Sequence, residues 1–202
     1  SYDSNNRVEY ILESVGTTGR LAVTRNIYDG NGQRIKQIRY DNTIAGTAQP
    51  STVVVGTSDQ IQVWGYDKDG RQIFHVDAIG AVTARVLDGN GNVVASKQYA
   101  APLSAANLAT VQNTPATATT TLRTVLPTAL GANDRVTHYV YDAASRLSYQ
   151  VDAEGGIAYY TYDLQGNVVQ RVEYAKPTNP LTLPDKASAA DVLARVVGDA
   201  AN

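Results

Sequence analysis

The sequence predicts a mainly β protein, an antiparallel hairpin meander or β-ribbon repeat scaffold with short helical insertions between the repeats. The first observation is an internal repeat, in which residues 134–175 match residues 59–100 without a gap at an offset of 75 (134 minus 59). The second is an alternation of apolar and polar residues with a period of two, typical of strands with one buried face. The third is a recurring Asp-x-x-Gly signal between the strands. A long repeat decides the architecture before any site is considered.

The composition excludes several classes of protein. The formal net charge is -2, from 17 basic and 19 acidic residues spread along the chain, so we expect no nucleic-acid partner. Cysteine is absent, which excludes disulfides and thiolate metal sites. No apolar run approaches the roughly 18 residues that cross a bilayer, so we expect no membrane span in this segment. Because the chain opens at Ser1 without a methionine, we expect it to be a piece of a longer polypeptide.

Three copies of the repeat begin at Tyr2, Tyr66 and Tyr141. The expected repeat units are 2–65, then 66–140 with an Ala/Thr/Pro-rich insertion at about 102–133, and then 141–202 with a C-terminal loop and a helix at about 189–197. Residues that recur at equivalent positions form the structural repeat signature. They are Tyr2, Asp3, Tyr28, Asp29, Gly32, Tyr40, Tyr66, Asp67, Gly70, Asp88, Gly91, Tyr99, Tyr141, Asp142, Tyr162, Asp163, Gly166 and Tyr174.

The alternation predicts which face of each strand is buried. In residues 146–151, Leu147, Tyr149 and Val151 alternate with polar residues, and an aromatic residue stands at the centre of that face. The equivalent positions are Val8, Tyr10 and Leu12 in the first copy and Gln72, Phe74 and Val76 in the second. Enrichment in Val and Tyr predicts two further strands, at 157–162 and 167–175.

The turns have a local chemical explanation. Several strands end in Asp, two variable residues and Gly, as in YDGNG, YDKDG, LDGNG and YDLQG. An aspartate side chain can accept a hydrogen bond from the backbone two residues ahead, and glycine accepts the left-handed conformation that closes a short hairpin. We therefore expect these residues to specify turns.

The segments between the copies have a different composition. Residues 41–58 are rich in Thr, Gly and Ala, which predicts a loop around a possible extra strand at 53–55. Residues 102–133 and 176–202 are rich in Ala, Thr and Pro, which predicts decorations packed on the β scaffold.

Two helices are expected in these decorations. Ser188 can cap a helix over Ala189–Val197, with Asp191 in its first turn and Gly198 as its stop. Its apolar face would hold Val192, Leu193, Val196 and Val197. A weaker helix is expected after Ser104, burying Leu108 and Val111.

Side chains that could carry chemistry have structural explanations. His75 and His138 align with Gln150 and Val63, so neither histidine is a repeated feature, and we expect ordinary surface or shell positions for both.

Asp88, Asn90 and Asn92 alternate like the start of a calcium loop, as do Asp29, Asn31 and Gln33, but the Gly and Glu that complete an EF-hand are absent. Asp77 and Asp152 are repeat equivalents rather than an acid/base pair. We expect no catalytic, cofactor-binding or metal-binding residues.

The 13 tyrosines leave two interpretations open. Tyrosine at fixed cross-strand positions supplies buried area and pair contacts. Alternatively, exposed aromatic faces could bind glycans, for example at Tyr159, Tyr160 and Tyr162. We expect the structural role, with glycan binding as the alternative.

The repeats resemble the bacterial YD-repeat (rearrangement-hotspot, Rhs) family, through YDKDGRQIFHVDAIG from Tyr66 and YDAASRLSYQVDAEGGIAYYTYDLQGN from Tyr141. The resemblance implies a long ribbon of hairpins, which in this family spirals into a hollow shell around a toxin or other cargo in large secreted bacterial proteins; animal adhesion receptors are related. The chain departs from the pattern at Asn6 and Ser145, which replace the turn glycine, and at Leu87, which replaces a tyrosine.

From these observations we expect a non-enzymatic structural segment, about three repeat units of a longer array, in a large exported bacterial protein found outside the cell or at its surface. The scaffold would form a toxin-type shell or a cell-surface fibre or filament. Its partners would be neighbouring repeats or identical subunits, with an enclosed cargo or surface glycans as further candidates. The alternative function is a carbohydrate-binding adhesin module.

Overall fold

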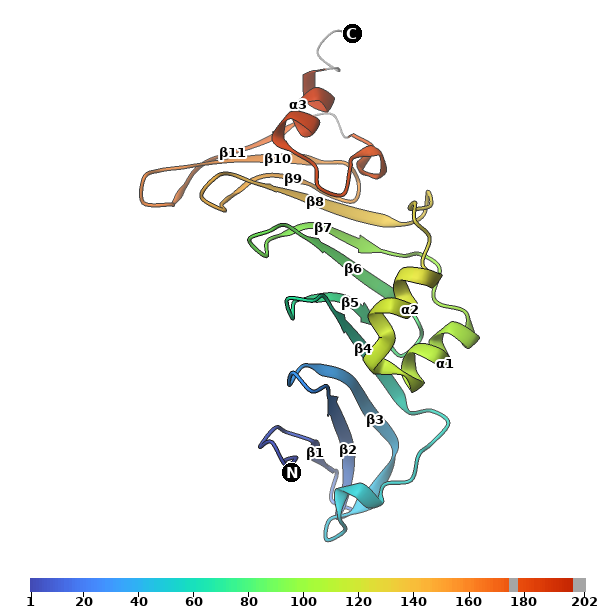
Figure 1. The fold of residues 1–202 in the computed structure, drawn as a ribbon. Coiled ribbons are helices and arrows are strands. Elements are labelled where there is room, and N and C mark those ends of the chain that lie inside the picture. The colour runs from blue at the N-terminus through green and yellow to red at the C-terminus, as the bar shows by residue number, and fades with distance from the viewer. Residues whose placement is uncertain (175–177, 198–202) are drawn as a thin grey trace. The chain divides into compact units, whose positions relative to one another are not determined.

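A computed structural model describes residues 1–174 and 178–197 and confirms the mainly β, antiparallel meander. Its strands follow one another in chain order in one open sheet (Figure 1). The strands are β1 (Tyr10–Val15), β2 (Arg20–Tyr28), β3 (Arg34–Ala45), β4 (Gln60–Tyr66), β5 (Gln72–Val76), β6 (Val82–Leu87), β7 (Val93–Gln98), β8 (Arg135–Tyr141), β9 (Leu147–Val151), β10 (Ile157–Tyr162) and β11 (Val168–Tyr174).

Helices occupy the insertions and the C-terminal segment. They are α1 (Ala105–Asn113), α2 (Ala118–Val125) and α3 (Ala189–Val197), with short 3-10 helices η1 (Pro50–Thr52), η2 (Pro115–Thr117) and η3 (Pro180–Thr182). The chain divides into two compact units, 1–82 with 102–126 and 83–101 with 127–202. The insertion at 102–126 thus belongs to the same unit as residues 1–82, although residues 83–101 stand between them in the sequence.

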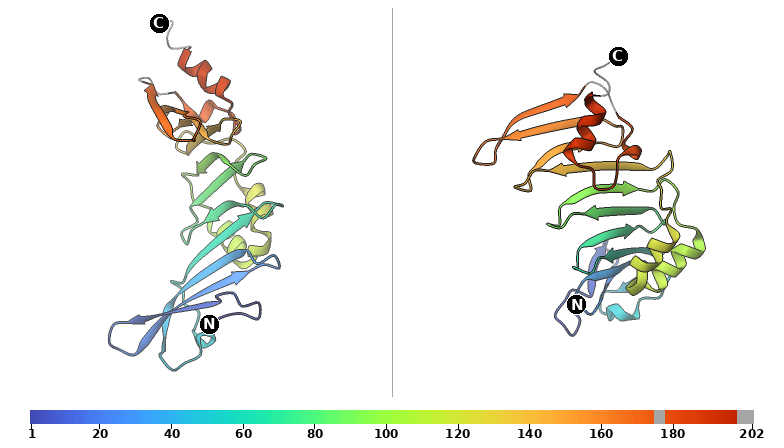
Figure 2. Two further views of the ribbon diagram at one scale, coloured as in Figure 1. Left: turned by 90° about the vertical axis from the view of Figure 1, so that its left-hand side faces the viewer. Right: turned by 45° about the horizontal axis from the view of Figure 1, so that its top comes forward.

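The first unit packs in two places. Tyr10, Val23, Tyr40 and Ile44 form one buried cluster on β1, β2 and β3. The helices α1 and α2 lie against β4, as Figures 1 and 2 show. The side chains that these helices bury completely are Val111 of α1 and Ala118 and Leu122 of α2.

The second unit has an apolar cluster under its C-terminal segment. Val140, Tyr149, Val151 and Ile157 come from β8, β9 and β10. Leu183, Ala187 and Val192 pack on them from the segment that contains η3 and α3, and Figure 2 shows α3 beside these strands. This segment is therefore the cover of the second core.

Both predicted helices form where their caps indicated. Ser104 Oγ accepts from the backbone N–H of Asn107 at the start of α1. At the start of α3, Ser188 Oγ accepts from Asp191 N–H, and the Asp191 carboxylate accepts from Ser188 N–H at 2.7 Å, a reciprocal cap. The sequence does not predict α2, because its three consecutive threonines have weak helix propensity, and packing rather than sequence preference holds it.

The predicted strand at 53–55 is wrong. Residues 50–52 form η1 instead, and Val54 and Val55 are 69% and 76% exposed. The strand β3 continues to Ala45, because 43–45 pair with 20–22 of β2. The expected loop from residue 41 therefore starts later.

Three burial predictions also need correction. Val8 and Leu12 are 38% and 37% exposed, because β1 lies at the sheet edge and only Tyr10 of that face reaches the core. In β5, Ile73 is buried as well as Phe74, so both faces are covered. Leu193 is 39% exposed, because the buried stripe of α3 passes through Val192.

Leu108 is half-buried rather than buried. Gly198 and Ala175, which the sequence places at the end of a helix and of a strand, lie outside the described residues.

Candidate functional site: the Tyr-Asp turns and their ladder

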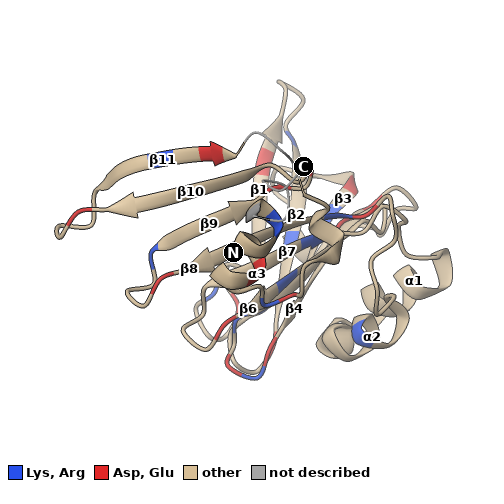
Figure 3. Ribbon diagram, turned by 90° about the horizontal axis from the view of Figure 1, so that it is seen from above, with Lys and Arg blue, Asp and Glu red and all other residues tan. Residues whose placement is uncertain are grey.

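The aspartate of each repeat turn organises four hydrogen bonds. One carboxylate oxygen, Oδ1, accepts hydrogen bonds from the backbone N–H groups two and four residues ahead. The backbone N–H of the aspartate donates to the carbonyl oxygen four residues ahead, and the N–H three residues ahead donates to the carbonyl oxygen of the aspartate. The described residues that do this are Asp3, Asp29, Asp67, Asp77, Asp88, Asp142, Asp152 and Asp163. Figure 3 shows acidic and basic residues at the hairpin ends.

The residue three positions after each aspartate has a positive φ. Six of these residues are Gly32, Gly70, Gly80, Gly91, Gly155 and Gly166, with φ between 79° and 90°. Asn6 and Ser145 adopt φ of 59° and 58° at the same position. The chain's two departures from the glycine pattern therefore keep the turn conformation at a conformational cost.

Ser145→Gly should stabilise the protein by about 1 kcal/mol, because glycine adopts this conformation without the steric penalty. The lost contact, Asn90 Nδ2 to Ser145 Oγ at 3.2 Å, is exposed and offsets little. A shift of the urea midpoint measures the effect. Ala144→Gly, one residue earlier in the same turn, is the control and should not stabilise; equal stabilisation by both variants would contradict the explanation.

Two of these turns extend the pattern beyond the Tyr-Asp pairs. The sequence identifies Asp77 and Asp152 only as repeat-equivalent carboxylates, yet VDAIG and VDAEG keep the Asp-x-x-Gly spacing with Val in place of Tyr. The spacing alone is the signal that marks them as turns.

Where a turn begins with Tyr-Asp, the tyrosine hydroxyl of four of these turns bonds to the backbone of a preceding hairpin. The hydroxyls of Tyr28, Tyr66, Tyr141 and Tyr162 donate to the carbonyls of Val8, Arg34, Val93 and Leu147, at 2.9, 2.9, 3.2 and 2.7 Å respectively. Each acceptor stands five residues after an aspartate of a preceding turn, since 3, 29, 88 and 142 plus five give 8, 34, 93 and 147. We call this set of bonds the tyrosine ladder.

Arginine strengthens two rungs of the ladder. Arg7 pairs with Asp3 of its own turn at 2.7 Å, donates to the carbonyl of Asp29 at 3.2 Å and stacks on Tyr28 at 4.6 Å. Arg146 repeats this arrangement with Asp142, Asp163 and Tyr162, stacking at 4.8 Å. The aromatic face, the hydroxyl and the aspartate carbonyl are thus all used to connect hairpins.

The remaining signature tyrosines lie in different surroundings. Tyr40 belongs to the core of the first unit, and Tyr174 packs against the core of the second. Tyr2 is 66% exposed. Tyr99 is half-buried, and burial raises the pKa of its phenol. The structure therefore does not bring all the signature residues into one site.

The residues considered for glycan binding already contact other side chains. Tyr159 packs on Tyr149 with ring centroids 4.7 Å apart, and Tyr162 is covered by Arg146. The Tyr160 hydroxyl accepts from Arg171 Nε at 3.3 Å. These contacts reduce the free aromatic surface available to a sugar.

The residues considered for metal binding and catalysis serve the turns or the core. Asp88 Oδ1 accepts from Asn90 and Asn92 N–H, and Asn92 Nδ2 donates to Oδ2. Across 1–174 and 178–197, no group of three or more His, Asp or Glu side chains could hold a metal ion.

The two histidines differ in burial. His75 is half-buried, stacks on Trp64 at 5.4 Å and contacts Gln62. Of the surface or shell positions expected for the histidines, His138 does not take a surface one, since it is 1% exposed and lies under η3.

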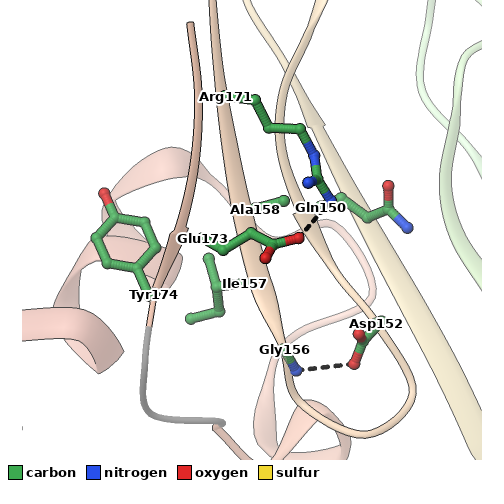
Figure 4. A pocket seen from close by; sticks show the side chains of 8 residues that line it. All are labelled: Gln150, Asp152, Gly156, Ile157, Ala158, Arg171, Glu173 and Tyr174. Carbon is green, nitrogen blue, oxygen red and sulfur yellow. Dashed lines mark hydrogen bonds and ion pairs between the residues drawn. The ribbon is translucent and has the colours of Figure 1, made fainter.

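One pocket lies on the strands of the second unit. Figure 4 shows Arg171 beside Glu173, paired at 2.6 Å, and Asp152 bonded to the Gly156 N–H. Gln150, Ile157, Ala158 and Tyr174 complete the lining. Arg171 and Glu173 thus pair with each other, and Asp152 belongs to its turn.

Tyr162→Phe should lower the free energy of unfolding by about 0.5 to 1.5 kcal/mol, because it removes the 2.7 Å rung to Leu147. Urea unfolding measures the change. Tyr160→Phe, in the same strand, removes only an exposed contact to Arg171 and should change stability by less. Equal losses would show that the hydroxyl bond to the backbone carbonyl has no special role.

These features define a class: an open antiparallel β-meander whose hairpins are joined by repeated Tyr-Asp turns. No family model matches the sequence, and no curated protein matches it. No helix of the described ranges is long and apolar enough to cross a membrane.

The fold is similar to solved structures of toxin complexes. A crystal structure of TcdB2-TccC3 without its hypervariable C-terminal region matches with a TM-score of 0.52 and 16% identity, over 85% of this chain and 7% of that chain. A crystal structure of TcdB2-TccC3-Cdc42 matches with 0.54 and 16%, over 86% and 8%. The Tc holotoxin pore of Photorhabdus luminescens, with a mutated TccC3, matches with 0.52 and 16%, over 92% and 8%. This chain thus spans less than a tenth of those chains, and the likeness shows the fold.

Proposed function

We propose that this chain is a non-enzymatic structural repeat segment that builds a β scaffold in a large exported bacterial protein of the YD-repeat type. The tyrosine ladder is the observation that carries the proposal. The motif's carboxylates, hydroxyls and guanidinium groups make bonds within and between hairpins, so the recurring polar groups of one repeat hold the next. A motif whose polar groups bond within and between hairpins is sufficient to build a scaffold.

The shell version of this proposal is supported by the fold likeness to TcdB2-TccC3 and to a Tc holotoxin pore that contains TccC3. In this version the segment is part of the wall around a toxin or other cargo, outside the producing cell. Its partners are neighbouring repeats, and the fibre version differs only in joining identical subunits end to end.

Electron microscopy of the full-length protein that contains this segment tests the proposal. We expect closed hollow particles. Long filaments would favour the fibre version over the shell version. Compact particles that are neither hollow nor filamentous would contradict both versions.

Glycan binding remains the alternative, and a separate experiment distinguishes it. Tyr160→Ala should leave a scaffold's assembly unchanged, since that ring has no ladder bond to a backbone carbonyl. Loss of binding to a glycan array with folding intact would favour an adhesin instead.

A further inference from the structure

His138 lies at the centre of β8, beneath the C-terminal segment of the second unit. Its side chain is 1% exposed, and Nε2 lies 3.0 Å from the carbonyl oxygen of Pro180, which is itself buried in η3. A carbonyl only accepts, so Nε2 carries the hydrogen. Nδ1 is buried and has no hydrogen-bond partner. This geometry fits the neutral imidazole, because protonation would add an N–H at Nδ1 with no acceptor.

The repeat itself shows that this position does not require histidine. Val63, 75 residues earlier, occupies the same place in β4 and is also 1% exposed. Val63 pairs with Val76, and His138 pairs with Val151, its repeat equivalent. Valine therefore fills the site in one unit, whereas the other has a titratable ring with an unsatisfied nitrogen, which costs stability.

The charged groups around His138 form one ion pair. Lys97 of β7 lies 2.7 Å from Asp185, in the loop after η3. The strand β9 presents Val151 and β7 presents Ala95 to the histidine position. Burial lowers the pKa of His138, with Lys97 acting in the same direction and the Pro180 hydrogen bond and Asp185 opposing it.

We propose that His138 is a pH-sensitive latch, whose protonation in mildly acidic solution releases the segment 178–197 from the strands of the second unit. The backbone of β8 is paired with both β7 and β9 at His138, so the strand holds the ring beneath the segment. Water reaches Nδ1 only if the cover leaves. The cover is held by the Pro180 contact, by Lys97–Asp185 and by the apolar packing of Leu183 and Val192.

The direction of the pH effect follows from linkage. Because the docked state holds His138 with a pKa below 6.5, docking is fully favoured above about pH 6.5 and weakens as the pH falls through the free histidine's range. For one proton, the docking equilibrium constant falls by up to about tenfold per pH unit, until the pKa of the docked state is reached.

Amide NMR of the full chain from pH 7.5 to 5 tests the latch. We expect the signals of Leu183, Ala187 and Val192 to move from docked to undocked positions as the pH falls, while Val111 in α1 stays unchanged. His138→Val, which copies the residue at position 63, should keep the segment docked throughout. His138→Gln supplies a second non-titrating variant, and His75→Gln, which copies Gln150, should titrate like the original protein.

Three results would overturn the proposal. The segment could remain docked at pH 5 in the original protein, or undock at the same pH in both His138 variants. Alternatively, Asp185→Asn could abolish the pH dependence while His138→Val retained it, which would assign the effect to the ion pair with Lys97.

Discussion

Gly155→Ala should destabilise the second unit by about 3 to 5 kcal/mol, the largest effect expected of an added methyl group at any described glycine. Gly155 has φ +88°, and a Cβ there would lie 1.7 Å from the backbone oxygen of Thr178. Thr178 also donates its N–H to the Gly155 carbonyl at 2.8 Å. The methyl group and the Thr178 backbone therefore cannot occupy the site together.

Gly166→Ala separates the two contributions to this loss of stability, the strain of the left-handed backbone and the clash with Thr178. Gly166 has the same φ of +88°, but a Cβ there would meet nothing within 4 Å. It should cost only the left-handed strain of about 1 to 2 kcal/mol. Gly80, the repeat equivalent of Gly155, would place a Cβ 3.4 Å from Leu103, an ordinary contact, and Gly80→Ala should resemble Gly166→Ala.

Urea unfolding with two probes measures these effects. Trp64 lies in the first unit and reports on it by fluorescence, whereas the amides of Leu183 and Val192 report on the second. We expect Gly155→Ala to shift the amide transition and leave the Trp64 transition in place. Losses no larger than those of Gly166→Ala would mean that Thr178 moves away at little cost.

The two insertions differ in length, yet the strands on either side of each keep the same arrangement. Asp59 and Asp134, which the repeat aligns, each use both carboxylate oxygens to hold the start and the end of an insertion. They accept backbone N–H groups from Asp41 and Gly56 and from Ala100 and Gly131, at 2.7 to 3.1 Å. The long loop closes as well as the short one, because loop entropy grows slowly with length.

What the sequence could predict was local. Asp-x-x-Gly specifies its turn through bonds within five residues, and Ser188 with Asp191 specifies a helix start in the same way. The acceptors of the tyrosine ladder could not be predicted, since they depend on strand register and lie 15 to 48 residues away. For His138, the sequence left a surface or shell position open, although its alignment with Val63 already contained the signal for burial.

The turn aspartates themselves should make the protein acid-labile below the histidine range. In Asp142, the hydrogen bond from the Arg146 N–H is the main cause that holds the carboxyl pKa below its usual 3.8. In Asp67, burial raises the pKa, but hydrogen bonds from Arg71 outweigh it, and the pKa is again lowered. The turn aspartates whose pKa is lowered are Asp3, Asp67, Asp88, Asp142 and Asp163.

A lowered pKa fixes the sign of the effect. Each of these carboxylates contributes stability that is present above about pH 3.8 and is lost as the pH falls through the lower pKa of the folded state. Because several groups take up protons together on unfolding, the urea midpoint should fall steeply below about pH 3.8. Measuring it in His138→Val removes the histidine contribution at higher pH.

Asp88→Asn gives the sharpest version of this experiment. Asn keeps the oxygen that accepts the Asn90 and Asn92 N–H groups but does not titrate, so the proton uptake on unfolding should fall by up to one proton. Asp69→Asn, at an exposed carboxylate paired with Lys68 and Arg71, is the matched control and should change the uptake less.

Adding about 1 M salt screens surface charge but leaves hydrogen bonds to backbone N–H groups in place, so the steep fall of the urea midpoint should persist. If salt abolished it, general charge repulsion rather than the turn hydrogen bonds would control acid unfolding.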